Sequence, residues 1–285
     1  MYQSNETLSA AIERNVREAL VEDIGLCDYT AQLVPDDLKT ARLIVREDAI
    51  LCGVAWFEAC LKTLDQDAQI QWRYREGDTM QANSEVCFIQ ARARALLSAE
   101  RPALNFLQTL SATATITNAY VKAIEGASPN PHGCHILDTR KTLPGLRQAQ
   151  KYAVTVGGGQ NQRLALWDGI LIKENHIAAA GGITQALQQA QALNAPVSIQ
   201  IEVENLLELK EALDAGATSI LLDNFSTDQM REAVQLTAGR ALLEASGGVD
   251  LVQVREIAAT GVDRISIGKL TKDVAATDYS LRVMA

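Results

Sequence analysis

Hydrophobic positions follow one rhythm in the first third of the chain. Leu8, Ile12, Val16 and Leu20 recur at every fourth position, which predicts an amphipathic helix that ends near Gly25. Farther on, apolar and polar residues alternate with the two-residue period of a strand that buries one face. We expect half-buried antiparallel strands, and hence a small α+β domain, from residues 40–46, 70–74 and 86–89.

A second rhythm begins after a long helical pattern over residues 100–125 and an exposed loop over 126–133. Short apolar, β-branched runs now alternate with helical stretches, which is typical of βαβ units and predicts a parallel sheet. Gly216 and Gly261 each stand where a helix would end just before a strand. This repeated pattern favours similar α/β units that close into a barrel. The expected strands are 136–137, 169–172, 197–203, 219–222, 241–243 and 264–267.

Composition limits the size of the core and the kinds of partner. The chain has 285 residues, 47% of them hydrophobic, which suffices for one large domain or two unequal ones. A net charge of -9 and a pI near 4.9 argue against a nucleic-acid partner, because phosphate backbones bind basic surfaces. With neither an export signal nor an apolar run near the roughly 20 residues that span a bilayer, we expect a cytoplasmic protein without a membrane partner.

The cysteines are scattered and form no C-x-x-C pair, so they match no zinc or redox motif. Buried free thiols in a reducing compartment are the simpler interpretation. The residues concerned are Cys27, Cys52, Cys60, Cys87 and Cys134.

Polar side chains follow the expected strands of the second half. In α/β barrels the catalytic groups gather at the carboxyl ends of the strands. One polar strand end can be a helix cap, but five in register are poorly explained by capping alone. The five sets are 173–176, Glu202 with Glu204, 223–224, 246–248 and 268–269.

Cationic side chains suggest what the carboxyl ends of these strands bind. Thr139, Arg140 and Lys141 follow an apolar pair and could by themselves be a solvated turn. A glycine loop at 157–159 changes this interpretation, because such loops can offer backbone N–H groups to an anion. The planar guanidinium of arginine pairs with a carboxylate or phosphate through two hydrogen bonds, whereas lysine acts as a compact point charge. A mixture of the two favours a ligand that carries both carboxylate and phosphate groups. We therefore expect convergence on one anion-binding cavity by Arg140, Lys141, Arg163 and Lys173.

Two carboxylates, Glu202 and Asp223, would repel such a ligand unless a positive group lay between them. Magnesium carried by a pyrophosphate satisfies this condition, because Mg²⁺ keeps several waters and takes few protein ligands. An ion pair between one of these carboxylates and a neighbouring lysine is the structural alternative.

Several motifs together point to one known family. They are Glu100-Arg101, ALNFL from Ala103, DTRKTLPGLR from Asp138, GGGQNQR from Gly157, LIKENHI from Leu171, IEVENL from Ile201, LLDN from Leu221, LEASGG from Leu243 and ISIG from Ile265. Over nearly its whole length the chain resembles quinolinate phosphoribosyltransferase, also called nicotinate-nucleotide pyrophosphorylase (carboxylating).

The resemblance implies a fold and an assembly. Residues 1–112 would form an N-terminal α/β sandwich domain, onto which the C-terminal tail 271–285 packs back. Residues 113–270 would form the catalytic domain, an open, incomplete α/β barrel of the type II phosphoribosyltransferase kind. The family also implies a homodimer, or a higher oligomer built from it, whose active sites each borrow an arginine from the partner.

The resemblance further implies a pentosyltransferase reaction of NAD biosynthesis. The phosphoribosyl group of phosphoribosyl pyrophosphate would pass to the nitrogen of quinolinate with loss of the C2 carboxylate, giving nicotinate mononucleotide, pyrophosphate and CO2. Carboxylates would stabilise the oxocarbenium-like ribose while Mg²⁺ and cations neutralise the leaving group. No organic cofactor is expected, because the ring nitrogen becomes cationic and stabilises the carbanion that decarboxylation leaves.

Motif positions carry the family's residue roles to this chain. Arg101 resembles the arginine that the partner supplies, and the expected catalytic residues are Lys141, Glu202 and Asp223, the last two also near Mg²⁺ through water. Quinolinate would meet Thr139, Arg140, Lys141, Gln162, Arg163 and Lys173. Phosphoribosyl pyrophosphate would meet Lys141, Lys173, Glu202, Asp223, Ser246, Gly247, Gly248, Ile267, Gly268 and Lys269.

Gln162 departs from the family, whose pattern usually reads Asn-His-Arg where this chain has Asn161-Gln162-Arg163. Glutamine can donate a hydrogen bond to a carboxylate but carries no charge. We expect it to preserve positioning and to weaken substrate affinity by about 1 kcal/mol.

Three other functions remain open from the residues. A related transferase of the molybdenum-transport paralogue type would keep the same barrel. A lysine Schiff-base aldolase would use Lys173 or Lys141 as its nucleophile. A relative that binds these ligands without turnover is the non-enzymatic alternative.

Overall fold

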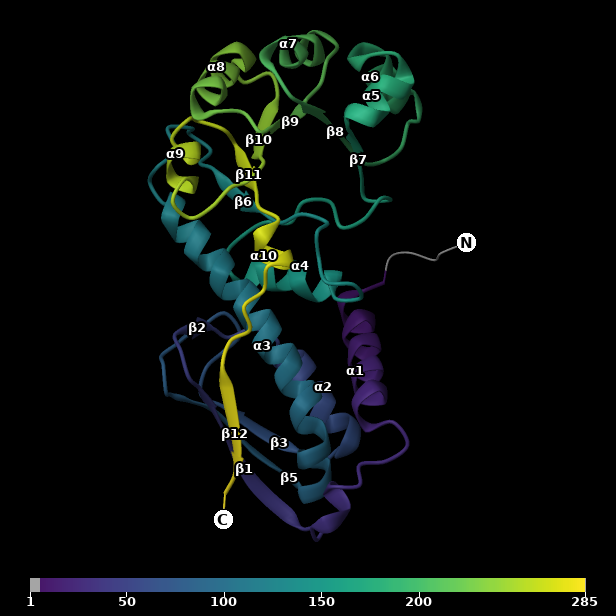
Figure 1. The fold of residues 1–285 in the computed structure, drawn as a ribbon, viewed down its shortest axis with the longest axis vertical. Coiled ribbons are helices and arrows are strands. Elements are labelled where there is room, and N and C mark those ends of the chain that lie inside the picture. The colour runs from purple at the N-terminus through teal and green to yellow at the C-terminus, as the bar shows by residue number, and fades with distance from the viewer. Residues whose placement is uncertain (1–5, 285) are drawn as a thin grey trace. The chain divides into compact units, whose positions relative to one another are not determined.

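The computed structural model describes residues 6–284 and divides them into two units (Figure 1). The first unit holds the residues up to Asn118, Thr142–Gly158 and the residues from Thr271 onward. The second holds Ala119–Lys141 and Gly159–Leu270. The expected division after residue 112 stays a prediction.

The sheet of the first unit is antiparallel, as the alternating pattern predicted. Its strand order is β12-β1-β5-β3, formed by Tyr279–Val283, Leu38–Val45, Glu85–Arg92 and Gln69–Trp72. Strand β12 lies at one edge and pairs with β1, from Ala41 opposite Val283 to Val45 opposite Tyr279. A two-stranded sheet joins β2 (Ala49–Ile50) to β4 (Thr79–Met80).

Helices of the first unit begin and end as their sequences dictate. Helix α1 (Leu8–Ile24) begins where the hydroxyl of Thr7 accepts a hydrogen bond from the amide of Ala10, and Gly25 ends it with φ of 55°. The other elements of this unit are η1 (Ala31–Leu33), α2 (Val54–Leu64) and α4 (Arg147–Val156). Helix α3 (Ala93–Ile124) continues past residue 118 and starts seven residues before the helix expected from residue 100.

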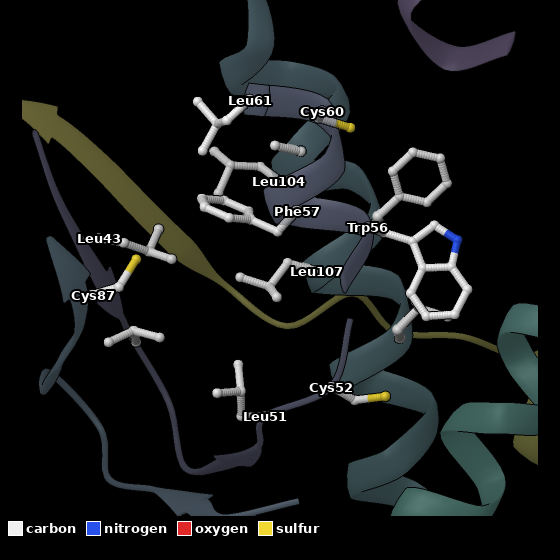
Figure 2. Close-up of a cluster of buried hydrophobic side chains, with 14 of the residues drawn as sticks. Leu43, Leu51, Cys52, Trp56, Phe57, Cys60, Leu61, Cys87, Leu104 and Leu107 are labelled. Atoms are coloured by element: carbon white, nitrogen blue, oxygen red, sulfur yellow. The ribbon is translucent and has the colours of Figure 1, made fainter. Parts of the chain in front are cut away.

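The core of the first unit is a cluster of apolar side chains and thiols (Figure 2). Trp56 and Phe57 on α2 are fully buried there. The ring of Phe57 meets the ring of Trp72 on β3 edge to face, with centroids 5.4 Å apart. Burial raises the pKa of the thiols of Cys52, Cys60 and Cys87, to about 12 for Cys60. All five cysteines are free as expected, but Cys27 and Cys134 are only partly buried.

Gly157 has a packing role that the sequence did not indicate. A Cβ atom at this position would lie 2.4 Å from the carbonyl oxygen of Ala114 on α3, so only glycine lets the end of α4 pack there. The amides of Gly157 and Gly158 donate to the carbonyl groups of Ala153 and Thr155. The expectation that this glycine run offers free N–H groups to an anion is therefore wrong for these two residues.

The second unit is an open, incomplete α/β barrel. Its parallel sheet has the order β6-β11-β10-β9-β8-β7, so β6 and β7 lie at its edges. In chain order the strands are His135–Leu137 (β6), Gly169–Ile172 (β7), Ser198–Val203 (β8), Ser219–Asp223 (β9), Leu242–Ser246 (β10) and Arg264–Ser266 (β11). The βαβ prediction is confirmed.

Helices cover the outside of this sheet (Figure 1). Buried residues at helical spacing, such as Leu209, Ala212 and Leu213 on α7, form an apolar stripe that faces the sheet. No described helix is long and apolar enough to cross a membrane. The covering helices are α5 (Glu174–Ala180), α6 (Ile183–Ala192), α7 (Leu206–Asp214), α8 (Thr227–Thr237) and α9 (Val254–Ala258). The short α10 (Lys269–Lys272) follows β11 and spans the division after Leu270.

Candidate active site

Most of the expected site residues lie at the carboxyl edge of the parallel sheet. Because all six strands run the same way, their carboxyl ends share one edge. Helix caps account for other polar residues here, since Asn205 caps α7 and Ser226 caps α8. At or just after strand ends the edge carries Thr139, Arg140, Lys141, Lys173, Glu202, Asp223, Ser246, Gly247, Gly248, Ile267, Gly268 and Lys269.

Lys173 and Glu202 form an ion pair across two neighbouring strands. The Nζ atom of Lys173, after β7, lies 2.7 Å from Oε2 of Glu202 on β8. The side chain of Lys173 is 47% exposed and that of Glu202 only 13%. This is the ion pair that the structural alternative expected, and it leaves the lysine accessible from solvent.

Arg140 and Arg163 form a second cationic feature. Burial is the main cause that lowers the pKa of Arg163, and the charge of Arg140 lowers it further. The guanidinium of Arg163 donates from Nη1 to the carbonyl oxygen of Gly169 at 2.7 Å. Gly169 begins β7, so Arg163 lies outside the row of strand ends. An anion that contacted both side chains would offset this repulsion.

The end of β6 packs against the end of β11. The hydroxyl of Thr139 accepts a hydrogen bond from the amide of Lys141 at 3.1 Å. A Cβ atom on Gly268 would lie 3.2 Å from Cδ of Lys141 and 3.6 Å from Oγ1 of Thr139. Lys141, which is exposed, and Gly268 are therefore neighbours. Both belong to the expected site for phosphoribosyl pyrophosphate.

The segments that follow β9 and β10 are in close contact. Gly247 has φ of 108°, and a Cβ atom there would lie only 2.1 Å from Oδ1 of Asn224. The backbone of Asn224 donates to the carbonyl oxygen of Ser246, and its side chain donates to Asp223. Only glycine fits at position 247, and this contact fixes the loop beside Asp223.

Carboxylates beyond the expected pair also gather at this edge. A hydrogen bond with Glu174 raises the pKa of the exposed Glu204, and the charge of Asp223 adds to the shift. Within residues 6–284, no three His, Cys, Asp or Glu side chains are placed to hold a metal ion directly. Glu202 and Asp223 remain candidates for contact with a metal through water.

Gln162 lies in a hydrogen-bond network rather than alone. Its amide nitrogen donates to Oε1 of Gln200 at 2.7 Å and to the Glu244 carboxylate at 3.2 Å. Gln200 and Glu244 were not singled out from the sequence. Gln200 carried a signal, because it is polar and stands two residues before Glu202 on the same face of an expected strand, whereas Glu244 lay beyond the expected end of its strand.

Arg101 is exposed on α3 in the first unit. Lys269, which is also exposed, begins α10. The expected convergence on one cavity of Arg140, Lys141, Arg163 and Lys173 stays a prediction.

The open barrel with this polar edge defines the class of the chain, an α/β-barrel enzyme. Its particular family follows from comparison with known proteins. Models of the quinolinate phosphoribosyl transferase C-terminal and N-terminal domains match residues 113–282 and 28–111. The chain belongs to the quinolinate phosphoribosyltransferase family.

Relatives from several bacteria agree with this assignment. The chain is 38% identical to a probable nicotinate-nucleotide pyrophosphorylase [carboxylating] of Bacillus subtilis, over 95% of this chain and 93% of that protein. It is 39% identical to the nicotinate-nucleotide pyrophosphorylase [carboxylating] of Mycobacterium leprae, over 95% and 96% of the two chains. The solved nicotinate-nucleotide pyrophosphorylase from Francisella tularensis superposes with a TM-score of 0.92 at 44% identity and covers both chains completely.

Proposed function

We propose that this chain transfers the phosphoribosyl group of phosphoribosyl pyrophosphate to the nitrogen of quinolinate, with loss of the C2 carboxylate. The products are nicotinate mononucleotide, pyrophosphate and CO2, and the reaction serves NAD biosynthesis. Family membership supports the reaction, and the arrangement of charges at the carboxyl edge supports the choice of substrates.

The neighbouring Arg140 and Arg163 are the observation that carries the proposal. Burial and the charge of Arg140 both disfavour the charged form of Arg163. A pyridine dicarboxylate removes this repulsion, because each guanidinium can pair with a carboxylate through two parallel N–H donors. A singly charged acid such as nicotinate provides one such group fewer.

The ion pair of Lys173 with Glu202 supports the second half of the reaction. When an anionic substrate binds Lys173, the Glu202 carboxylate becomes available to stabilise positive charge on the ribose. Asp223, at the end of β9, would act with it, and Lys141 beside Gly268 would contact the departing pyrophosphate.

We propose that Mg²⁺ enters with phosphoribosyl pyrophosphate and contacts Glu202 and Asp223 through water. When bound, the ion neutralises charge on the leaving pyrophosphate. Carboxylates without further protein ligands suit this mode of binding, because the phosphate oxygens and water supply the remaining positions.

We further propose a cytoplasmic homodimer in which Arg101 completes the partner's site. Its exposed position on α3 leaves it accessible to a second subunit. Mixing an Arg101→Ala variant with an Arg163→Ala variant should restore up to about a quarter of the activity, because random exchange of subunits gives some dimers one intact site. If the mixture stays inactive after exchange, the shared site is excluded.

The alternatives are less well supported. A Schiff-base aldolase needs a desolvated, neutral lysine, whereas Lys173 is half exposed and paired with a carboxylate. A paralogue that acts on another acid remains testable with the same assay.

The deciding experiment combines purified protein with quinolinate, phosphoribosyl pyrophosphate and Mg²⁺. We expect nicotinate mononucleotide and one CO2 for each nucleotide formed. Nicotinate in place of quinolinate is the matched control and should be a poor substrate. If no nucleotide forms from quinolinate, or if nicotinate reacts equally well, the proposed function is wrong.

A further inference from the structure

Three polar side chains form a closed triangle of hydrogen bonds inside the barrel. Gln162 donates to Gln200 at 2.7 Å and to Oε2 of Glu244 at 3.2 Å. Gln200 donates to the same Oε2 atom at 2.9 Å. Glu244 is 1% exposed and Gln200 is 6% exposed, so these groups have exchanged water for one another.

The Glu244 carboxylate at one end of the network and the backbone N–H of Arg163 at the other fix the direction of every hydrogen bond. A carboxylate only accepts hydrogen bonds, so Glu244 makes both glutamines turn their NH2 groups toward it. The carbonyl oxygen of Gln162 then faces the opposite way and accepts the backbone N–H of Arg163 at 2.6 Å. Because a backbone N–H only donates, the reversed orientation of Gln162 would place donor against donor at Arg163 and acceptor against acceptor at Glu244.

The triangle lies one layer beneath the candidate site. Side chains two residues apart on a strand share a face, so Gln200 lies below Glu202 on β8 and Glu244 lies below Ser246 on β10. These strands are not neighbours, because β9 separates them. The network therefore joins two strands that the backbone of the sheet does not join directly.

A further hydrogen bond connects the network to the segment after β6, at the edge of the sheet. The backbone N–H of Gln162 donates to Oδ1 of Asp138 at 2.9 Å, and Asp138 is completely buried. Gln160 forms a parallel bridge with Leu137 on the same strand. Both the backbone and the side chain of Gln162 are therefore held where the chain enters Arg163.

We propose that Glu244 and Gln200 are positioning residues for the transferase reaction and that they act through Gln162 on Arg163. Glu244 sets the orientation of the amides, Gln162 fixes the backbone of Arg163, and Arg163 is thereby held beside Arg140 to receive a carboxylate. Both amide hydrogens of Gln162 already have acceptors, so Gln162 acts through this network instead of donating to the substrate. The inference rests on the proposed function.

The central test is Glu244→Gln in the full-length protein. The substitution keeps the shape but replaces an acceptor with an NH2 group that finds no acceptor in the triangle. We expect KM for quinolinate to rise about tenfold, the scale of one buried polar group left unsatisfied, while kcat changes less than about threefold. Glu256→Gln, at an exposed carboxylate of the same unit, is the matched control and should leave both constants unchanged.

A double-variant cycle separates positioning from general stability. If Glu244 acts through Arg163, adding Glu244→Gln to Arg163→Lys should raise KM by less than about twofold. A purely structural role predicts a lower melting temperature with unchanged KM, and that result would overturn the proposal. Gln200→Met, which removes two of the three hydrogen bonds of the triangle, provides a second route if Glu244→Gln does not fold.

Hydrogen exchange provides a readout that does not need activity. The Arg163 amide should exchange at least about tenfold faster in Glu244→Gln than in the unchanged protein, because its acceptor is no longer held. Equal exchange rates would overturn the network even if KM changed. If the unchanged protein makes no product but exchange responds as expected, the proposed function fails while the network stands.

Discussion

The core of the first unit and the interior of the barrel bury side chains in different ways. Around Phe57 the first unit packs mainly rings, aliphatic chains and thiols, and the indole N–H groups of Trp56 and Trp72 donate to Asn15 and Glu58 (Figure 2). The barrel buries Asp138, Gln200 and Glu244, which are polar throughout their end groups and are held by hydrogen bonds. Apolar packing is non-directional and supplies stability, whereas a polar network fixes orientation. The first region should therefore control folding and the second should control substrate binding.

The largest effect should come from the apolar core. Phe57→Ala removes a fully buried ring that contacts Trp72, and should lower the free energy of unfolding by about 3–5 kcal/mol. Urea unfolding measures this loss. At a temperature where the variant remains folded, KM for quinolinate should be unchanged. Leu207→Ala, at a side chain that is 83% exposed, is the control and should change stability by less than about 0.5 kcal/mol.

Arg140→Lys should lower catalytic efficiency and leave stability nearly unchanged. The lysine keeps the charge but loses the forked donor, which should cost about 1.5–3 kcal/mol of transition-state binding, or roughly 10- to 150-fold in kcat/KM. Steady-state kinetics give this value, and the melting temperature should stay nearly the same. Arg231→Lys, at an exposed ion pair with Asp228, is the control. Activity close to that of the unchanged protein would remove Arg140 from the site.

The smallest effect concerns reactivity within the first unit. Burial raises the pKa of Cys60 to about 12, so at pH 8 its thiol stays protonated and unreactive. Cys27 is partly exposed, and iodoacetamide should label it at least about tenfold faster, as peptide mass spectrometry would show. In denaturant the two rates should converge. If Cys60 reacts as fast as Cys27 in the folded protein, this core opens more readily than its packing indicates.

The strands of the barrel could be predicted because hydrophobic runs and glycines mark them directly. The expected strand 169–172 matches β7 from end to end. Strand β10 was expected at 241–243 but runs from Leu242 to Ser246, since parallel pairing with β9 continues to Ser246 opposite Asp223. Hydrophobicity stops at Leu243, whereas backbone pairing does not.

That misplaced strand end explains why Glu244 was missed. A polar residue beyond an assumed strand end is interpreted as part of a loop, so its place inside the barrel was hidden. Its partners, Gln162 and Gln200, lie 82 and 44 residues away in the chain, and no local pattern reports such contacts. Gly157 was misinterpreted for the same reason, because its contact with Ala114 is also remote in the sequence.

The pairing of β12 with β1 has a consequence for how the chain is made. Ala41 finds its partner at Val283, so the first sheet lacks its edge strand β12 until Tyr279–Val283 has been translated. Until then the ribosome-bound chain presents an uncovered β1, and uncovered strand edges invite pairing with other chains. Deleting Tyr279–Val283 should therefore impair the folding of the sheet that contains β1.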